Sequence, residues 1–343
     1  MKKLILALLV VILLGGLLVY GCGEEAGPTS STPVALRWAH FAAAQLESSV
    51  PLTAMAANIG QRTNGKCTVQ LFWSDSLVPM FEAMDAVRTG SAEMASFPFG
   101  PFGGADVRFA SSEMPLYYNT IEAQMEAQGA LMPAYSGVLE EKFNQKALTV
   151  TSIISLNPGS VKKPIKTLAD WKGMMVQTIS PQMSAVIQAF GATGAPASPI
   201  DVYELLEKGT VDSTVQSLGK FVEAKLWEVC PYLTNAQFIP ASAVMTINSD
   251  VWKKLPKDVQ DVILDEAKKA EAEVNRITKE TYYSYLDQLT KNMQVYNLPK
   301  AERDNWIKAV QPIVDDLLSK MGDFADQVKK TADAANKKYP YPY

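Results

Sequence analysis

The chain has 343 residues, of which 48% are hydrophobic and 20% are charged, a balance typical of a globular protein and not of a disordered one. Its formal net charge is −4 at pH 7, which gives a nucleic-acid partner no electrostatic support. The single histidine and three cysteines form no Cys/His cluster, so we expect no structural zinc site, no other metal and no cofactor.

The amino terminus predicts export. Met1-Lys2-Lys3 precede an apolar run from Leu4 to Tyr20, and Val19-Tyr20-Gly21-Cys22 resembles the lipobox that is cut before a lipidated cysteine. We therefore expect residues 1–21 to be a signal peptide and Cys22 to carry a lipid, which would leave 343 − 21 = 322 residues in the mature protein. It would lie in the periplasm or at the cell surface, anchored to a membrane by its lipid. The alternative is an uncleaved amino-terminal anchor.

The segment that follows is polar, and after it strands and helices alternate. Residues 22–33 are rich in Gly, Pro, Ser and Thr and predict a flexible tether. The patterns then predict a strand over 36–41, a helix over 47–62, a strand over 66–73, a helix over 80–89 and a strand over 93–97. This order predicts an α/β domain with a largely parallel sheet.

The middle of the chain predicts a second α/β region. A helix over 119–145 and a buried strand over 147–154 are followed by Leu156-Asn157-Pro158-Gly159, which we interpret as a break and a domain boundary. Further on we expect strands over 174–178, 211–216 and 241–247, helices over 181–191, 200–208, 256–292 and 299–336, and a loose tail, KKYPYPY.

Several motifs, in order, resemble one known family. Lys166-Thr167-Leu168-Ala169-Asp170-Trp171-Lys172-Gly173 and Val211-Asp212-Ser213-Thr214-Val215-Gln216 resemble the second domain of the solute-binding proteins that serve TRAP transporters. The other landmarks are Trp38-Ala39-His40, Arg62-Thr63-Asn64-Gly65-Lys66, Glu113-Met114-Pro115-Leu116-Tyr117 and Thr246-Ile247-Asn248.

This resemblance implies a two-domain periplasmic-binding-protein-like α/β fold with mixed, mostly parallel sheets. Domain I would comprise 34–154 and 238–280, and domain II 155–237 and 281–336, with the long helix lying along both. It also implies a receptor that delivers a small-molecule ligand to TRAP-type membrane permease subunits, and no enzyme. A sensory receptor without a permease, or an exported hydrolase, are the alternatives.

The resemblance also places the binding residues. The arginine that clamps the ligand's carboxylate in this family falls on Gln177, and an asparagine that contacts the ligand falls on Gln216. Amides carry no charge, so we expect a neutral, zwitterionic or weakly held monocarboxylate ligand and not a simple dicarboxylate. The alternatives are a relocated arginine, Arg37 or Arg108, and a Gln177 amide that merely faces solvent.

Further ligand contacts are expected near the ends of the predicted strands. His40 ends the first strand, where open α/β sheets bind ligands, although a structural role is as plausible. The remaining candidates are Trp38, Trp73, Phe97, Phe99 and Asn157. For the aromatic residues, an ordinary place in the core is at least as plausible.

Chemistry at other positions is not expected. The chain has no phosphate-binding glycine-rich loop and no G-x-S-x-G elbow, which argues against catalysis. Cys67 and Cys230 could form a disulfide after export, but their separation favours two buried free thiols.

Overall fold

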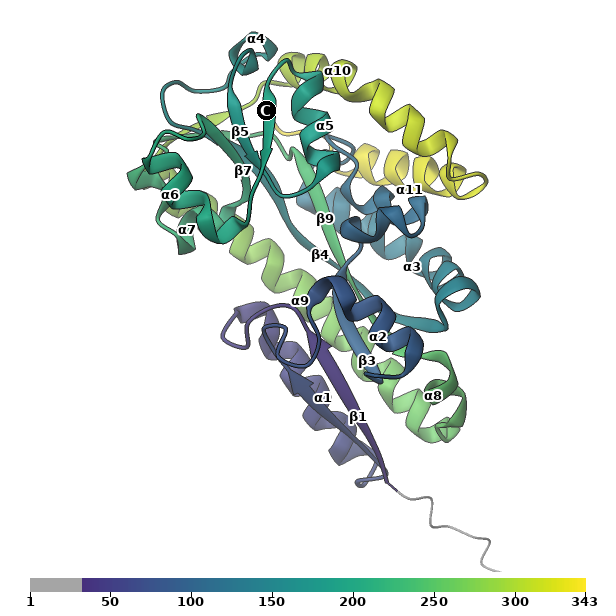
Figure 1. Ribbon diagram of the computed structural model, residues 1–343. Coiled ribbons are helices and arrows are strands. Elements are labelled where there is room, and N and C mark those ends of the chain that lie inside the picture. The colour runs from purple at the N-terminus through teal and green to yellow at the C-terminus, as the bar shows by residue number, and fades with distance from the viewer. Residues whose placement is uncertain (1–32) are drawn as a thin grey trace, which may run out of the picture. The chain divides into compact units, whose positions relative to one another are not determined.

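The computed structural model describes residues 33–343 (Figure 1). The predicted signal peptide, the lipidation site Cys22 and nearly all of the predicted tether lie outside these residues. None of the helices among the described residues is long and apolar enough to cross a membrane.

One continuous mixed sheet organises the fold. Its strands follow the order β2 (Cys67–Phe72), β1 (Val34–His40), β3 (Met94–Pro98), β9 (Ile239–Asn248), β4 (Gln145–Ser160), β7 (Ser213–Ser217), β5 (Met175–Thr178) and β6 (Thr193–Pro196). The short strand β8 (Tyr232–Asn235) pairs with β4 and with β10 (Gln294–Asn297). The strand pairs β1–β2, β1–β3, β5–β6, β5–β7 and β8–β10 are parallel, and the pairs that involve β4 or β9 are antiparallel.

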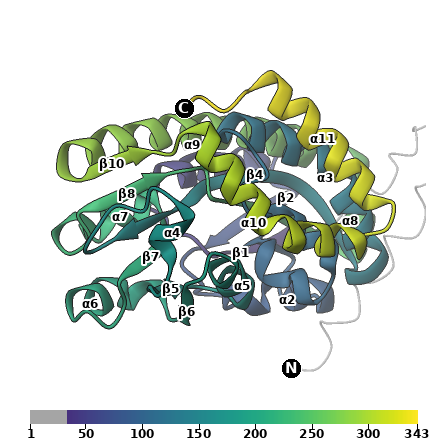
Figure 2. The ribbon, with the colours of Figure 1, turned by 90° about the horizontal axis from the view of Figure 1, so that it is seen from above.

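Helices cover this sheet. The shorter ones are α1 (Val50–Arg62), α2 (Ala83–Thr89), α4 (Leu168–Trp171), α5 (Pro181–Ala189), α6 (Val202–Glu207), α7 (Leu218–Glu223) and α8 (Ser249–Lys254). The longer ones are α3 (Ile121–Phe143), α9 (Lys257–Asn292), α10 (Lys300–Ser319) and α11 (Phe324–Lys338), and the view from above shows them on the outside of the strands (Figure 2). Local signals start several of them: Thr120, Ser180 and Ser217 accept backbone N–H bonds in the first turns of α3, α5 and α7.

The prediction that the chain breaks at residues 156–159 is wrong, because β4 runs through them to Ser160. Val161 N donates to Asp212 O, and in an antiparallel pair the hydrogen-bonded residues alternate. The residues of β4 that bond to β7 are therefore the odd-numbered ones. Pro158, which has no N–H, is not one of them, so no hydrogen bond to β7 is lost there. At Gly159 a Cβ atom would lie 2.5 Å from the Phe221 ring. This glycine therefore serves close packing inside a strand and not a turn.

Two other predictions differ from the structure. The helix predicted over 299–336 is two helices, α10 and α11, with Gly322 between them at φ +58°, a conformation that favours glycine. The tail predicted to be loose is docked: Tyr341 Oη donates to Leu298 O at 2.7 Å, and the Arg303 guanidinium lies 4.5 Å from the Tyr341 ring centre. The strands β6, β8 and β10 were not predicted.

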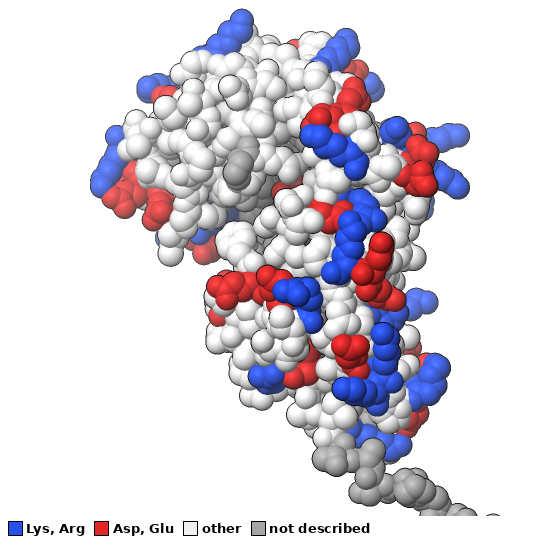
Figure 3. All heavy atoms as spheres, turned by 45° about the vertical axis from the view of Figure 1, so that its right-hand side comes forward, with Lys and Arg blue, Asp and Glu red and all other residues white. Residues whose placement is uncertain are grey.

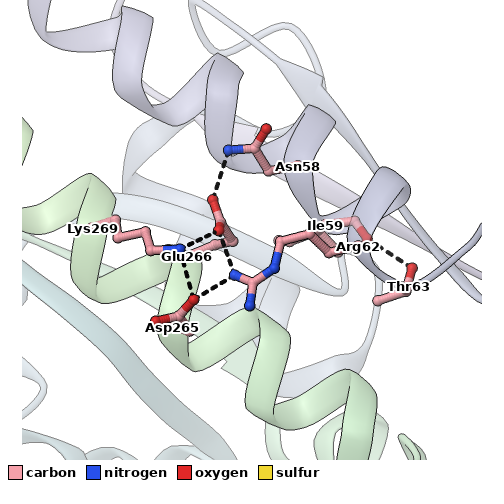
Figure 4. Close-up of polar contacts among 7 residues, drawn as sticks. All are labelled: Asn58, Ile59, Arg62, Thr63, Asp265, Glu266 and Lys269. Carbon is pink, nitrogen blue, oxygen red and sulfur yellow. Dashed lines mark hydrogen bonds and ion pairs between the residues drawn. The ribbon is translucent and has the colours of Figure 1, made fainter.

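The long helix α9 ties the two ends of the sheet together, as the resemblance implied. Its first half packs on residues of β1 and α1, and its second half packs near α6 and α7. On the α1 side, the buried carboxylate of Glu266 accepts hydrogen bonds from Asn58 Nδ2 at 2.8 Å and Lys269 Nζ at 3.0 Å, and it also pairs with Arg62 (Figure 4). This network fixes α9 against α1.

Cys67 and Cys230 are both buried and free, as predicted. Burial raises the pKa of the Cys67 thiol to about 11 and that of the Cys230 thiol still further. Both thiols therefore stay protonated near neutral pH and behave as packing groups.

Candidate functional site

Two sets of strand ends face each other across the middle of the sheet. Strand β3 ends at Pro98, which pairs with Ala243 of β9, and Ala243 pairs with Thr151 of β4. Strand β7 runs in the opposite direction to β3 and ends at Ser217, which pairs with Leu156 of β4. The two levels lie five residue steps apart along β4, which corresponds to a gap of about 16 Å. The carboxyl ends of β1, β2 and β3 thus point toward the carboxyl ends of β5, β6 and β7.

The surface is hollowed at this height. The space-filling view shows the hollow between the upper part of the molecule, where Figure 1 places β5 and β7, and the lower part with β1 and β3 (Figure 3). Open α/β sheets bind ligands at the carboxyl ends of their strands, so the hollow is the candidate binding cleft.

Gln177 and Gln216 meet on the upper side of the cleft. Gln216 Nε2 donates to Gln177 Oε1 at 2.9 Å, and Thr214 Oγ1 donates to the same oxygen at 2.6 Å. Gln177 Nε2 donates to Ala197 O at 2.8 Å, and Gln177 has no exposed surface. Its amide is therefore satisfied inside the protein and does not face solvent. No donor among the described residues reaches Gln216 Oε1, which remains an available acceptor.

Two further polar groups belong to the upper side, and sequence reasoning missed both. Gln182 lies in the first turn of α5, and its Nε2 is buried without a hydrogen-bond partner among the described residues. Lys220 lies in the first turn of α7, with its Nζ 3.5 Å from Glu223 Oε1. Both follow strand ends directly, and that position is the only signal in the sequence that could have found them.

The lower side of the cleft carries an aromatic cluster that contains His40. The imidazole stacks on Phe41 with ring centres 5.1 Å apart and lies 4.8 Å from the Trp73 ring. Burial lowers the pKa of His40 to about 4, so the ring is uncharged at neutral pH. His40 Nδ1 accepts from Ala42 N at 3.1 Å, so the proton of the neutral ring is on Nε2, for which no acceptor is found within residues 33–343.

The other candidates are buried. Trp38, Phe97 and Phe99 have no exposed surface and lie in the hydrophobic core, where Trp38 Nε1 donates to Ser96 Oγ at 2.9 Å. Asn157 is also fully buried, and its Oδ1 accepts from Ala236 N at 2.9 Å. These four side chains support the strands of the cleft, whereas His40, Trp73 and the Gln177–Gln216 pair belong to its two sides.

Neither arginine suggested as a relocated anchor is free. Arg37 donates to both carboxylate oxygens of Glu93 at 2.8 and 2.9 Å, at the end of β3 remote from the cleft. Arg108 pairs with Asp106 at 2.7 Å, and this guanidinium holds the pKa of the Asp106 carboxyl well below its usual range. Because both charges are already paired, neither replaces an arginine at position 177.

Comparison with known proteins agrees with this architecture. The family described as bacterial extracellular solute-binding protein, family 7 (DctP), matches residues 39–321. The C4-dicarboxylate-binding periplasmic protein DctP of Rhodobacter capsulatus is 22% identical over 318 residues, which cover 90% of this chain and 93% of that protein.

Solved structures share the fold. A TRAP periplasmic solute-binding protein of Ochrobactrum anthropi, whose C-terminus is bound in its ligand-binding pocket, has a TM-score of 0.83 and 22% identity, covering 89% of this chain and 97% of that one. A TRAP periplasmic solute-binding protein of Desulfovibrio salexigens, with bound orotic acid, has a TM-score of 0.76 and 22% identity, covering 89% and 99%. Together with the family match, the two-domain α/β architecture confirms the predicted fold, and the chain belongs to the DctP family of TRAP-type solute-binding proteins.

Proposed function

We propose that this chain is an exported receptor that captures a small organic molecule between the facing strand ends and delivers it to a TRAP-type permease. The family consists of solute-binding receptors. The cleft supports the same role, because hydrogen-bonding groups line its upper side and aromatic rings line its lower side.

We further propose that the ligand is not a simple dicarboxylate. The observation that carries this inference is the satisfied amide of Gln177, at the position where the resemblance places the family's carboxylate-binding arginine. Burying a carboxylate without a paired cation is costly. Arg37 and Arg108 are engaged elsewhere, and Lys220 on the upper side of the cleft lies beside Glu223. The ligand of this chain would thus differ from the C4-dicarboxylates named for the relative from R. capsulatus.

Closure of two domains around the ligand follows from the connections across the cleft. Six connections pack in both halves and would have to bend if the two sets of strand ends approached each other: β4, β9, α3, α9, α10 and the segment near Leu116. A ligand that contacts both sides favours the closed state over the open one.

A thermal-shift screen of the purified mature protein against several hundred metabolites tests the proposal. A ligand at 100 times its dissociation constant stabilises the folded state by about 2.7 kcal/mol, which is readily detected. The bound compound should then be recovered chemically unchanged by mass spectrometry. Recovery of an altered compound would indicate an enzyme, and the absence of any hit would argue against a solute receptor.

Membrane attachment is tested separately. We expect Cys22→Ala to release the protein from membranes into the soluble fraction, because the thiol is the proposed lipid attachment site. Mature wild-type protein that still begins at Met1 would contradict cleavage.

A further inference from the structure

An isolated carboxyl group lies on the lower side of the cleft, at its inner end. Glu113 ends the 3₁₀ segment Val107–Glu113, and its carboxyl group packs over Gly100, just beyond the end of β3. A Cβ atom on Gly100 would lie 1.7 Å from Glu113 Cδ, so the carboxyl occupies the space that only a glycine leaves open.

The chain crosses between the two halves of the molecule at this residue. Met114, the next residue, packs in the hydrophobic cluster of β3 and α3, whereas Leu116 packs with Trp171 in the cluster behind β5. Phe99 N donates to Ser242 O of β9. Gly100, the next residue, therefore lies level with the part of β9 that crosses the gap between the two sets of strand ends. Glu113 therefore lies at the inner end of the cleft.

No protein group within residues 33–343 compensates this carboxyl. Glu113 takes part in no hydrogen bond or ion pair there, and Asp106 and Arg108 on the same segment pair with each other. Burial alone raises the pKa of Glu113 to about 7, without a contribution from a neighbouring charge. A half-buried carboxyl without a protein partner can gain one from outside the protein.

We propose that Glu113 receives a positively charged nitrogen of the ligand, which makes the ligand a cation or a zwitterion with an ammonium-type group. This proposal rests on the proposed function and names the chemical class of the ligand. A charge-assisted N–H···O bond would supply the partner that Glu113 lacks.

The surroundings of Glu113 suit such a group. Strand β1 is the neighbour of β3 in the sheet, so the rings of Phe41 and Trp73 belong to the same edge, and aromatic faces attract ammonium groups. The hydroxyls of Ser152 and Ser242, register partners in β4 and β9, are buried and have no hydrogen-bond partner among the described residues. His40 adds no opposing charge, because it is neutral.

The test uses a panel of amino acids, polyamines and betaines, each beside its N-acetylated or deaminated counterpart, in thermal-shift assays with the full mature chain. We expect ammonium compounds to stabilise the protein and their uncharged counterparts not to. The best compound is then titrated by calorimetry into the wild type, Glu113→Gln, Gly100→Ala and Glu271→Gln.

We expect Glu113→Gln to weaken binding at least about tenfold, since the charge-assisted bond is lost. Gly100→Ala should do the same while keeping the carboxylate, because the added methyl displaces it. Glu271 is the matched control: burial also raises its pKa to about 7, but it packs on α9 against Gly129 of α3. Binding at pH 7 should release about half a proton from the wild type and none from Glu113→Gln.

The outcomes separate the two proposals. Tight binding of neutral or purely acidic compounds with unchanged affinity in Glu113→Gln would overturn the role of Glu113 and leave the receptor function standing. Equal losses in Glu113→Gln and Glu271→Gln would also overturn it, since a general effect on folding would explain them. If no compound of this panel or of the metabolite screen binds, both proposals fail.

Discussion

Gln216 Nε2 donates a hydrogen bond to Gln177 Oε1 across adjacent strands, at 2.9 Å and with both side chains buried. An amide–amide hydrogen bond therefore lies where the resemblance implies a charged group in the family. On Gln216, Oε1 and the second N–H of Nε2 have no partner among the described residues, so this side chain can both accept from and donate to a ligand, but it brings no charge to balance an anion.

Gln177→Ala should weaken binding of the true ligand by about 1 to 3 kcal/mol, because Gln216 loses the acceptor that orients it. Calorimetry with the ligand from the screen measures this loss. Gln188→Ala, an exposed glutamine on α5, is the control and should leave affinity unchanged. Unchanged affinity in Gln177→Ala would show that the pair has no part in recognition.

Stability should fall as pH rises from about 4.5 to above 7, because burial raises the pKa values of Glu113 and Glu271 to about 7 from 4.5. Each group favours folding while it is protonated and ceases to do so as pH rises through its folded-state pKa. One pKa unit corresponds to about 1.4 kcal/mol, and partial exposure of the group reduces this amount. We therefore expect the change in unfolding free energy caused by Glu271→Gln to be more favourable at pH 8 than at pH 4.5 by about 1 to 2 kcal/mol.

The neutral His40 acts in the opposite direction. Burial lowers its pKa from the ordinary value of 6.5 to about 4 in the folded protein, so its contribution to stability is present above pH 6.5 and is lost as pH falls toward 4.

Urea unfolding at several pH values in wild type and Glu271→Gln isolates the contribution of the glutamate. An identical dependence of the unfolding free energy on pH in both proteins would contradict the predicted contribution of Glu271.

Arg62→Ala should destabilise the protein by about 1 to 2 kcal/mol, because it removes a partner from the buried carboxylate of Glu266 at the α1–α9 contact (Figure 4). Arg88→Ala breaks an exposed ion pair with Asp85 and should cost less than about 0.5 kcal/mol. Chemical denaturation compares the two variants, and equal effects would mean that burial of Glu266 does not matter.

Tyr341→Ala should cost about 1 to 2 kcal/mol, because the tail then loses both the hydrogen bond to Leu298 O and the ring that faces Arg303. Tyr341→Phe keeps the ring and should lose only part of that amount. Thermal melts of the two variants resolve the difference. A tail that contributes nothing would give wild-type melting temperatures for both.

The sequence predicted long or strongly patterned elements well and short or tertiary features poorly. The apolar spacing of residues 256–292 predicted α9 to within one residue at its start, whereas β6, β8 and β10 have four residues each and too little pattern to detect. Gly159 looked like a turn because its close contact with Phe221 comes from a distant segment.

The candidate site was predictable where a resemblance supplied positions, as for Gln177 and Gln216. Their mutual hydrogen bond was not predictable, since it depends on β5 and β7 being neighbours with a particular register. Glu113 was not predicted as a binding residue, because its isolation depends on packing over Gly100, which no local pattern encodes.

Calorimetric titration of succinate and L-malate into the purified mature protein tests the central claim most directly. The account predicts no binding tighter than about 100 μM, since Gln177 stands where the resemblance implies an arginine, and within residues 33–343 Arg37, Arg108 and Lys220 already have carboxylate partners. An unpaired carboxylate is costly to bury. The ligand from the screen, titrated into the same sample, shows that the protein is competent to bind. Submicromolar binding of either dicarboxylate would contradict the account and would mean that Arg37 or Arg108 leaves its carboxylate partner to hold the ligand.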